Sequence, residues 1–326
     1  MTCIRSEIIG FGHCLPPKVL TNDDLANMVD TNDEWIRTRT GIQSRHIADK
    51  DLTTSMIAGD AVAEAIKNAG ISPEDVDLFI LASVTPDNTT PSSATKIAGR
   101  LGFRAGIPAF DISAACAGFI YALMLADNMI RLGQIKTAVI AGAECVSKII
   151  DWTDRNTCVL FGDGAGAAVL RAREGKGTSE DTGVLDVCIH SDGSLFDVLK
   201  TNGGVSSTQT AGIVEMNGKE VFKHAVVRLS EAAEQVMKET GISSEDIDWF
   251  VPHQANIRII ESVGERLNIP QEKVIVTVDH HGNTSAASIP LAIYENMLSG
   301  RIKKGDLLVF CAMGAGFTWG GAVVRL

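Results

Sequence analysis

The sequence predicts an α/β protein made of two similar halves, because one pattern of helix, glycine and strand occurs twice. The segment 63–80 (AEAIKNAGISPEDVDLFI) is echoed by the segment 234–251 (EQVMKETGISSEDIDWFV). Each copy has an amphipathic stretch typical of a helix, a glycine where that helix would end, an acidic turn and an apolar strand. A likeness that extends over so many consecutive positions indicates an internal repeat.

Two further pairs of segments follow in the same order. RLGQIK precedes an apolar run near Val139, and LSGRIK precedes another near Leu307. Glycine-rich stretches at Gly164 and Gly316 each lead into an apolar strand, so both halves end in the same way. We therefore expect an N-terminal half over residues 1–171 and a C-terminal half over residues 172–326.

The segments 117–132 and 285–299 are apolar on nearly every face, which predicts helices buried between layers. We expect a strand before each of them, at 108–111 and at 274–278. The offset that relates RLGQIK to LSGRIK carries Cys116 onto Asn283. These two residues are therefore expected at equivalent strand-to-helix corners of the two halves.

Composition excludes several classes of protein. With 45% apolar residues in 326, the chain can bury a large core. A net charge of −11 argues against a general nucleic-acid binder, which needs a basic surface. Seven cysteines without a CxxC pair favour neither a disulfide framework nor a zinc site. No apolar run has membrane-spanning length and no signal peptide is recognisable, so we expect a cytoplasmic protein without membrane contact.

Cys116 lies where a predicted strand passes through small residues (DISAACAGF) into a buried helix. A thiol at a helix N-terminus meets unpaired backbone N–H groups and the positive end of the dipole, which favour the nucleophilic thiolate. The same N–H groups could hold the oxyanion formed from a thioester. Cysteine in an Ala- and Gly-rich stretch is also a common core residue.

Two polar residues of the second half are candidates to act with this cysteine. His253 directly follows the repeated strand, at the edge where open α/β sheets bind ligands. Asn283 stands in DHHGNTSAAS, which also fits a turn and a helix N-cap. Each therefore has a structural reading beside the catalytic one.

His280 and His281 raise the question of a metal site. Adjacent residues diverge on a strand, and no carboxylate or cysteine stands at a useful spacing from them in the sequence. We therefore expect no bound metal.

Five motifs in order closely resemble the β-ketoacyl-acyl-carrier-protein synthase III family of the thiolase-like fold. The resemblance covers nearly the whole chain, through segments 32–42, 114–118, 252–256, 281–286 and 316–320. It implies two pseudo-symmetric halves in stacked α-β-α-β-α layers, a homodimer and no cofactor. It also implies an acyltransferase that condenses an acyl-CoA starter, expected to be acetyl-CoA, with malonyl-acyl-carrier protein to initiate fatty-acid synthesis.

The resemblance assigns roles residue by residue. Cys116 would accept the acyl group, and His253 and Asn283 would stabilise the enolate formed when the malonyl group loses CO₂. The backbone N–H groups of Cys116 and Gly316 would form the oxyanion hole. The remaining assignments are CoA-binding residues Trp35, Arg39 and Arg155, acyl-pocket residues Met216 and Phe222, and carrier-binding residues Gln254, Ala255, Asn256, Ile257, Arg258, Lys223 and Arg266.

Two departures from the family pattern bear on specificity. Glu265 stands where some relatives would have a basic residue, which bears on carrier affinity. The loop 86–91 also differs from the commonest pattern and would lie near the acyl pocket and the dimer contact. Starter length is therefore left open by the sequence.

Other activities fit parts of the pattern. A related thiolase-like synthase or acyltransferase of secondary metabolism fits nearly as well. Chain-elongating synthases would place histidine at Asn283, and degradative thiolases would need a second cysteine near the last glycine-rich turn. A Cys-His-Asn hydrolase would act without CoA, and a non-catalytic acyl-binding protein would not need all three polar positions.

Overall fold

Two β-sheets form the framework of the computed structural model, which describes residues 3–326. The first sheet has the order β1 (Cys3–Cys14), β7 (Gly164–Gly175), β6 (Thr137–Glu144), β4 (Leu78–Ala82) and β5 (Ala109–Ile112). The second has the order β11 (Trp249–Pro252), β12 (Leu307–Gly314), β13 (Thr318–Arg325) and β8 (Gly183–Ser191). Two small hairpin-like pairs lie outside them: β2 (Lys18–Thr21) with β3 (Ser44–Ile47), and β9 (Leu199–Thr201) with β10 (Val214–Met216).

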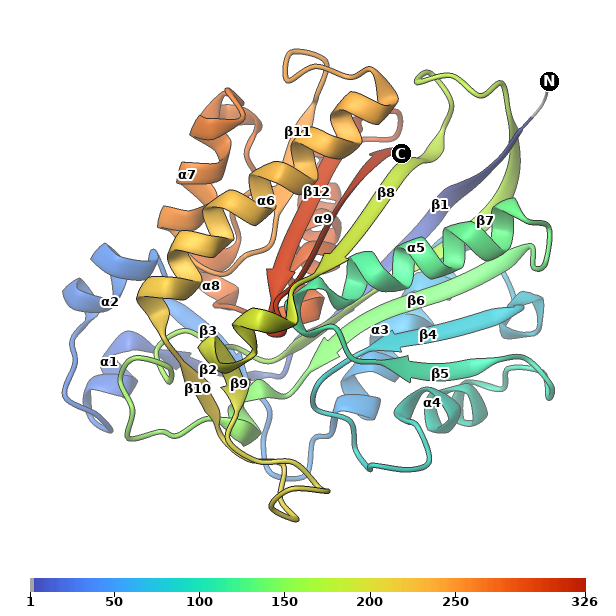
Figure 1. Cartoon of the computed structure of the whole chain (residues 1–326). Coiled ribbons are helices and arrows are strands. Elements are labelled where there is room, and N and C mark those ends of the chain that lie inside the picture. The colour runs from blue at the N-terminus through green and yellow to red at the C-terminus, as the bar shows by residue number, and fades with distance from the viewer. Residues whose placement is uncertain (1–2) are drawn as a thin grey trace.

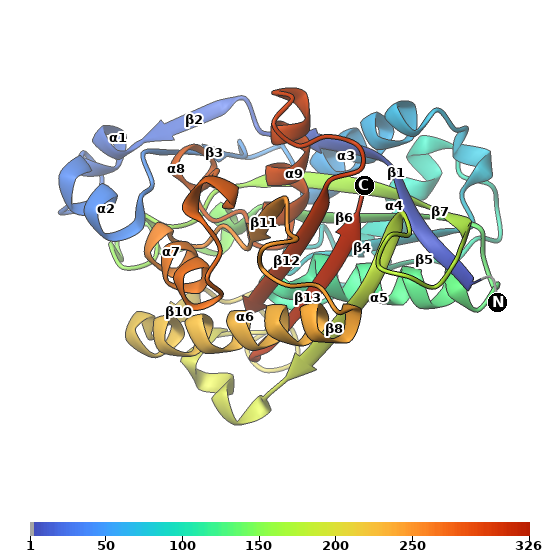
Figure 2. The same cartoon turned by 90° about the horizontal axis from the view of Figure 1, so that it is seen from above.

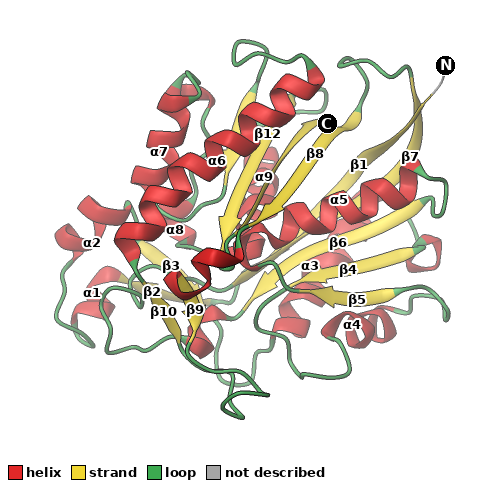
Figure 3. Cartoon of the chain, in the orientation of Figure 1, coloured by secondary structure: helices red, strands yellow, loops and turns green. Residues whose placement is uncertain are grey.

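Helices cover both outer faces and fill the space between the sheets (Figures 1 and 3). One core joins the outer face of the first sheet to α3 (Thr54–Ala69) and α4 (Ser93–Leu101). A second lies between the sheets around α5 (Gly118–Arg131) and α9 (Ser288–Leu298). A third joins the second sheet to α6 (Gly218–Thr240) and α7 (Ile257–Arg266). Seen from above, α3 and α6 lie on opposite outer sides (Figure 2), so the expected α-β-α-β-α layering is confirmed.

The internal repeat predicted from sequence is present in three dimensions. Helices α3 and α6 each end at a left-handed glycine, Gly70 at φ 65° and Gly241 at φ 69°, and lead into β4 and β11. β4 runs parallel to β6, as β11 runs parallel to β12. The closing strands β7 and β13 are antiparallel to these partners. The division at residue 171 stays a prediction, and β7 runs across that position.

The expectation that Cys116 and Asn283 occupy equivalent positions is wrong, because the two strand-to-helix corners match in a different register. Each buried helix is preceded by a 3₁₀ turn, Ala115–Ala117 before α5 and Ser285–Ala287 before α9. Both turns begin with a left-handed residue that is not glycine, Ala115 at φ 46° and Ser285 at φ 52°. Matching these turns makes Ala286 the counterpart of Cys116, and Asn283 lies before the second turn.

The prediction of a strand at 274–278 is also wrong. Only Val274 forms a bridge, to Phe250, and the chain then turns into the short helix α8 (Val278–His281). The buried Gln254 holds this segment, because its amide oxygen accepts from the N–H groups of Thr277 at 2.8 Å and Val278 at 3.2 Å. The Gln254 side chain thus takes the backbone N–H groups that would otherwise bond to a neighbouring β-strand. The strand expected at 108–111 is present as β5.

Two further short helices lie at one end of the molecule, where α2 (Asp33–Thr40) contacts α7 and α1 (Asn22–Ala26) contacts α2 (Figure 1). Among the described residues, no helix is both long and apolar enough to span a membrane. All seven cysteines are free thiols.

Gly142 of β6 lets the turn before α9 approach the first sheet closely. A Cβ at this position would clash with the carbonyl group of Ala286 and press on the backbone nitrogen of Ala287. Because both neighbours are backbone atoms, they cannot move aside as a flexible side chain could. The position of the turn therefore depends on a missing methyl group.

We expect Gly142→Ala to lower the free energy of unfolding by roughly 1–3 kcal/mol, the usual cost of overpacking. The matched control is Gly99→Ala in α4, where an added Cβ meets no atom within 4 Å. There alanine should stabilise the helix by up to about 1 kcal/mol. Urea unfolding of both variants measures the two effects, and an equal change in both would contradict the argument.

Candidate active site

One apolar cavity brings the three predicted catalytic side chains together. Cys116 from the turn before α5, His253 after β11 and Asn283 after α8 all line it. They come from segments far apart in the sequence, and the sheets and buried helices determine their meeting point. A second cavity also reaches Cys116, on the side of Ala115 and Gly316. Cys116 therefore lies where two cavities adjoin.

Cys116 is partly buried in its 3₁₀ turn and lies two residues before Gly118, the first residue of α5. Burial raises the pKa of its thiol to about 12. The free thiolate expected from the helix terminus is therefore not the resting form. The thiol must lose its proton as it reacts.

The end of β12 lies directly against the backbone of Cys116. A Cβ on Gly314 would clash with the Cys116 nitrogen, so only glycine allows this approach. Gly316 follows with a φ of 134°, a left-handed conformation that favours glycine, and lines the second cavity with Cys116. The two proposed oxyanion-hole residues are thus close to one cavity wall.

His253 is buried and neutral. Burial lowers its pKa to about 4, so the imidazolium is rare near neutral pH. Its Nδ1 lies 2.7 Å from the Ser288 hydroxyl oxygen, which also accepts from the backbone N–H of Gln254 at 3.4 Å. Among the described residues, Nδ1 is the one hydrogen-bond acceptor near the Ser288 hydroxyl, so we assign the hydroxyl proton to this bond. This tautomer leaves an N–H on Nε2, the nitrogen available to donate into the cavity.

The Asn283 side chain is oriented by the backbone two residues further along the chain. Its side-chain oxygen accepts from the N–H of Ser285 at 2.9 Å. The main chain is fixed on both sides, since its N–H donates to the Leu160 carbonyl at 2.8 Å and its carbonyl accepts from Gly162 at 3.0 Å. With the amide oxygen engaged, the NH₂ group is free to donate to a ligand.

Ser285 and Ser288 are functional residues that the sequence reasoning missed. Both lie within the GNTSAAS segment, in which only Asn283 is assigned a role from the sequence. Ser285 lines the second cavity beside Cys116 and holds Asn283 through its N–H, and Ser288 holds His253. Their spacing around the start of a buried helix is the signal that could have identified them.

Glu144 is a second residue that the sequence reasoning missed. It ends the otherwise apolar strand β6, is 0% exposed, and its carboxylate accepts hydrogen bonds from four residues. They are Ser83 at 3.2 Å, the Val84 N–H at 3.1 Å, Thr85 at 2.8 Å and Ser285 at 3.1 Å. A charged residue at the end of an apolar strand was the available signal.

The three predicted CoA-binding residues form a cluster that adjoins the first cavity through Asn256. The guanidinium carbons of Arg39 and Arg155 lie 4.5 Å and 5.0 Å from the centre of the Trp35 ring. Asn256, which lines the cavity, donates to the Arg39 carbonyl at 3.0 Å. This combination of aromatic ring and two cations suits a purine base and phosphates.

The predicted carrier-binding residues separate into two groups. Arg258 lies over the ring of Phe222 at 5.6 Å, and Lys223 and Arg266 are exposed on the neighbouring helices α6 and α7. Ala255, Asn256 and Ile257 are partly exposed. Gln254, by contrast, is 1% exposed, and its amide nitrogen also donates to the Pro252 and Ile275 carbonyls. It supports this surface from inside and does not reach a docked partner.

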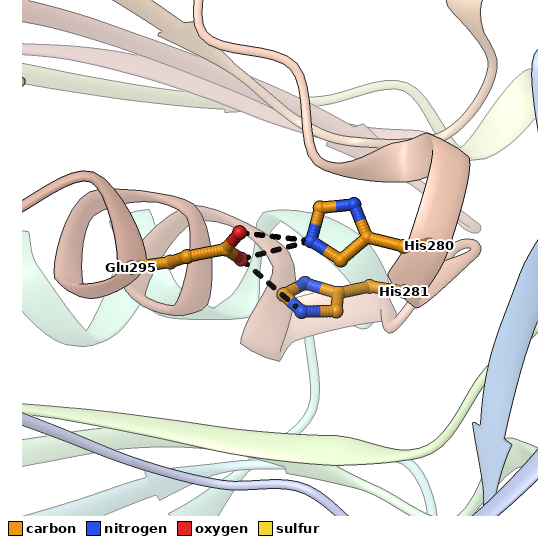
Figure 4. Close-up of side chains that lie close together, drawn as sticks. All are labelled: His280, His281 and Glu295. Carbon is orange, nitrogen blue, oxygen red and sulfur yellow. Dashed lines mark hydrogen bonds and ion pairs between the residues drawn. The ribbon is translucent and has the colours of Figure 1, made fainter. Parts of the chain in front are cut away.

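His280, His281 and Glu295 form a compact cluster outside the cavity (Figure 4). The expectation that the histidines diverge and lack a carboxylate is wrong, because 278–281 is helical and Glu295 approaches from α9. His280 Nε2 lies 2.9 Å from Glu295, and its Nδ1 lies 2.9 Å from Asp279. An imidazolium between two carboxylates satisfies this arrangement, so the absence of a metal stays a prediction.

Hydrogen bonds to Asp279 and Glu295 raise the pKa of His280 to about 10. Its stabilising charge is fully present below the ordinary histidine pKa of about 6.5 and is lost as pH rises toward 10. We expect His280→Gln to destabilise the protein more at pH 6 than at pH 10, measured by urea unfolding. The control is His190→Gln, whose ring bonds to the uncharged Gln235 amide. An equal loss for His280→Gln at both pH values would contradict the assignment.

Comparison with known proteins identifies the family. Residues 110–193 match the model described as 3-oxoacyl-[acyl-carrier-protein (ACP)] synthase III, and residues 237–326 match its C-terminal counterpart. A beta-ketoacyl-[acyl-carrier-protein] synthase III of Rhodospirillum centenum is 55% identical over 322 residues, covering 99% of both chains.

Solved structures agree in fold over nearly the whole chain. The 3-oxoacyl-[acyl-carrier-protein] synthase III of Aquifex aeolicus has a TM-score of 0.91 and 46% identity, covering 98% of this chain and 100% of its own. The priming β-ketosynthase of the R1128 polyketide pathway has a TM-score of 0.91 and 34% identity, covering 98% and 96%. The chain therefore belongs to the 3-oxoacyl-[acyl-carrier-protein] synthase III family of condensing acyltransferases.

Proposed function

We propose that this chain condenses an acyl-CoA starter with malonyl-acyl-carrier protein in two half-reactions at Cys116, the first step of fatty-acid synthesis. The observation that carries the proposal is the single cavity lined by a thiol, a neutral imidazole and a primary amide. Thioester chemistry at a thiol needs an oxyanion hole, and decarboxylation needs donors for an enolate. Both kinds of group are available around Cys116.

In the first half-reaction Cys116 attacks the thioester of acyl-CoA and CoA leaves as a thiol. The nucleotide would lie on Trp35 between Arg39 and Arg155, and the pantetheine arm would pass along the first cavity beside Met216 and Phe222. The N–H groups of Cys116 and Gly316 would stabilise the tetrahedral oxyanion. This assigns Met216 and Phe222 to the thioester arm instead of the acyl group.

In the second half-reaction the malonyl thioester loses CO₂ and its carbonyl oxygen becomes negative. His253 Nε2–H and the Asn283 NH₂ group would donate to that oxygen, and the resulting carbanion would attack the acyl-Cys116 carbonyl. The carbon–sulfur bond then breaks, and Cys116 leaves as a thiolate that takes up a proton from solvent. A neutral histidine suits this task. It donates a hydrogen bond from Nε2–H to the thioester oxygen and does not transfer a proton to the malonyl carboxylate. Each such donor typically lowers the barrier by about 3–4 kcal/mol.

The acyl group would lie in the second cavity, beyond Cys116. Its apolar wall includes Val146, Ile149, Phe161 and Leu199. A third cavity shares Val84 and Ile149 with it and extends along the loop that contains Pro86 and Asp87. The expected starter is acetyl-CoA, and this connection leaves room for longer ones.

Other parts of the proposal follow from the same chemistry. Arg258, Lys223 and Arg266 give the surface around the cavity opening local positive charge, which suits an acidic carrier. Both substrates bring their own thioesters, so no cofactor is required. A homodimer in the cytoplasm is the expected state, and seven free thiols accord with a reducing compartment.

A priming synthase of secondary metabolism is the second candidate. The 34% identity to the R1128 priming ketosynthase over nearly the whole chain favours it. The 55% identity to a beta-ketoacyl-[acyl-carrier-protein] synthase III favours fatty-acid initiation more strongly. Starter preference, measured with acetyl, longer and branched acyl-CoA, distinguishes the two.

We expect Cys116 to carry the label after incubation with radiolabelled acetyl-CoA, and Cys116→Ala to carry none. Asn283→Ala should still be acylated but should form the 3-oxoacyl product about 10²–10³-fold more slowly, since it loses an enolate donor. Rapid-quench assays of each half-reaction separate the two effects. A wild-type protein without label at Cys116 would refute the proposed mechanism.

Trp35→Ala is expected to raise the KM for acetyl-CoA roughly 10-fold or more, through lost stacking on the base. The same variant should use acetyl-pantetheine as well as the wild type does, because that substrate has no nucleotide. Steady-state kinetics with both substrates measure the difference. Equal impairment with both would show that Trp35 acts on the fold and not on the nucleotide.

A further inference from the structure

The acylation of Cys116 releases a proton that the groups above do not readily accept. His253 has its Nδ1 engaged by the Ser288 hydroxyl and its Nε2 protonated in the assigned tautomer. Asn283 has no basic site. The Cys116 thiol nevertheless has to lose its proton while it attacks the thioester. Some other group near the sulfur is needed.

One side chain joins the surroundings of the sulfur to a buried carboxylate of the first sheet. Cys116 and Ser285 both line the second cavity, and the 3₁₀ turns that begin beside them are in contact. The Ser285 hydroxyl in turn donates to Glu144 Oε1 at 3.1 Å. One hydroxyl group therefore separates the nucleophile from a fully buried carboxylate.

The surroundings of Glu144 suit a group that gains and loses a proton. Its four partners are three hydroxyl groups and one backbone N–H, and none of the described lysine, arginine or histidine residues pairs with it. The donors support the ionised form, while the absence of a cation leaves the carboxylate basic. Hydroxyl groups can also turn to accept from a protonated carboxyl group.

We propose that Glu144, acting through Ser285, takes the proton of the Cys116 thiol during acylation and returns it to the departing CoA thiolate. As the sulfur–carbon bond forms, the thiol proton moves to the Ser285 oxygen and the Ser285 proton moves to Glu144. When the bond to CoA breaks, the same path runs in reverse and CoA leaves as a thiol. No proton or electron is gained or lost overall.

This inference rests on the proposed acylation of Cys116. In the proposed step Glu144 touches no substrate. It acts only through Ser285, as a positioning residue that holds the proton and returns it. The charges of the two groups are coupled, because ionised Glu144 raises the pKa of Cys116. Transfer of the proton to Glu144 removes that opposing charge as the thiolate forms.

The pH dependence of acylation provides the first test. Burial raises the pKa of Glu144 to about 7, and its titratable neighbours are Cys116 and Cys145. A protonated Glu144 cannot accept, so the rapid-quench rate of acetyl transfer to wild-type Cys116 should fall as pH drops through about 7. Glu144→Gln should lose this pH dependence and acylate about 10²-fold more slowly, as for other lost proton acceptors.

Two serine variants distinguish proton transfer through Ser285 from the general stabilisation of the Glu144 carboxylate by its hydrogen bonds. Ser285→Ala cuts the path but keeps the N–H that holds Asn283, and Ala115 shows that alanine can adopt this left-handed turn. It should lose the pH dependence as Glu144→Gln does. Ser83→Ala removes a similar hydrogen bond from Glu144, at 3.2 Å, but leaves Ser285 in place. This variant should keep the pH dependence of acylation.

A second readout distinguishes proton transfer from a structural role. Without the negative charge at position 144, the Cys116 thiol should become more acidic, so iodoacetamide should label the Cys116 peptide of Glu144→Gln at lower pH than in the wild type. Faster alkylation with slower acylation supports the proposal. An unchanged pH profile in Ser285→Ala, or parallel losses in both readouts, overturns it. Wild-type protein that fails to acylate at all would instead refute the proposed function.

Discussion

The close contact between Gly142 of β6 and the turn Ser285–Ala287 is the constraint on which the site depends. It brings a corner of the second half against the first sheet, where only a residue without a Cβ leaves room. From that corner the N–H of Ser285 orients Asn283, its hydroxyl donates to Glu144 beside Cys116, and Ser288 at the start of α9 holds His253. The turn and the first residue of α9 therefore position Asn283 and His253 around Cys116.

Burial gives these side chains a particular resting state. The pKa of Cys116 is raised to about 12 and that of His253 is lowered to about 4, both mainly through loss of solvation. The pair therefore rests as thiol and neutral imidazole, and not as the thiolate–imidazolium ion pair of a cysteine hydrolase. A neutral site is suited to successive acyl-thioester substrates, because hydrogen bonds become stronger where negative charge develops.

Sequence could predict the parts of this fold that repeat local patterns. The helix, glycine and strand units around Gly70 and Gly241 have the same order in both halves, and the structure has them as α3–β4 and α6–β11. The family resemblance also predicted that Cys116, His253 and Asn283 would meet. Their meeting depends on the topology of an α/β fold, which the repeat already indicated.

Sequence could not predict features that depend on a distant partner. The run 274–278 (VIVTV) has strong strand propensity, yet the Gln254 amide takes the N–H groups of Thr277 and Val278 that a strand would need. That capture turns the chain into α8 and aims His280 and His281 toward Glu295. The role of Glu144 likewise depends on Ser285, which lies in the other half of the chain.

The two cavities at Cys116 explain why the nucleophile lies at a corner and not within a strand or helix. A corner residue can face one cavity on the side of Phe222 and another on the side of Gly316. The first cavity would serve each thioester arm in turn, while the second keeps the acyl group in place between the half-reactions. The left-handed residue Ala115 begins the 3₁₀ turn that contains Cys116, and Ser285 begins the matching turn of the second half in the same conformation. In the proposed mechanism the duplicated corner therefore supplies the nucleophile in one copy and the hydroxyl group of the proton path in the other.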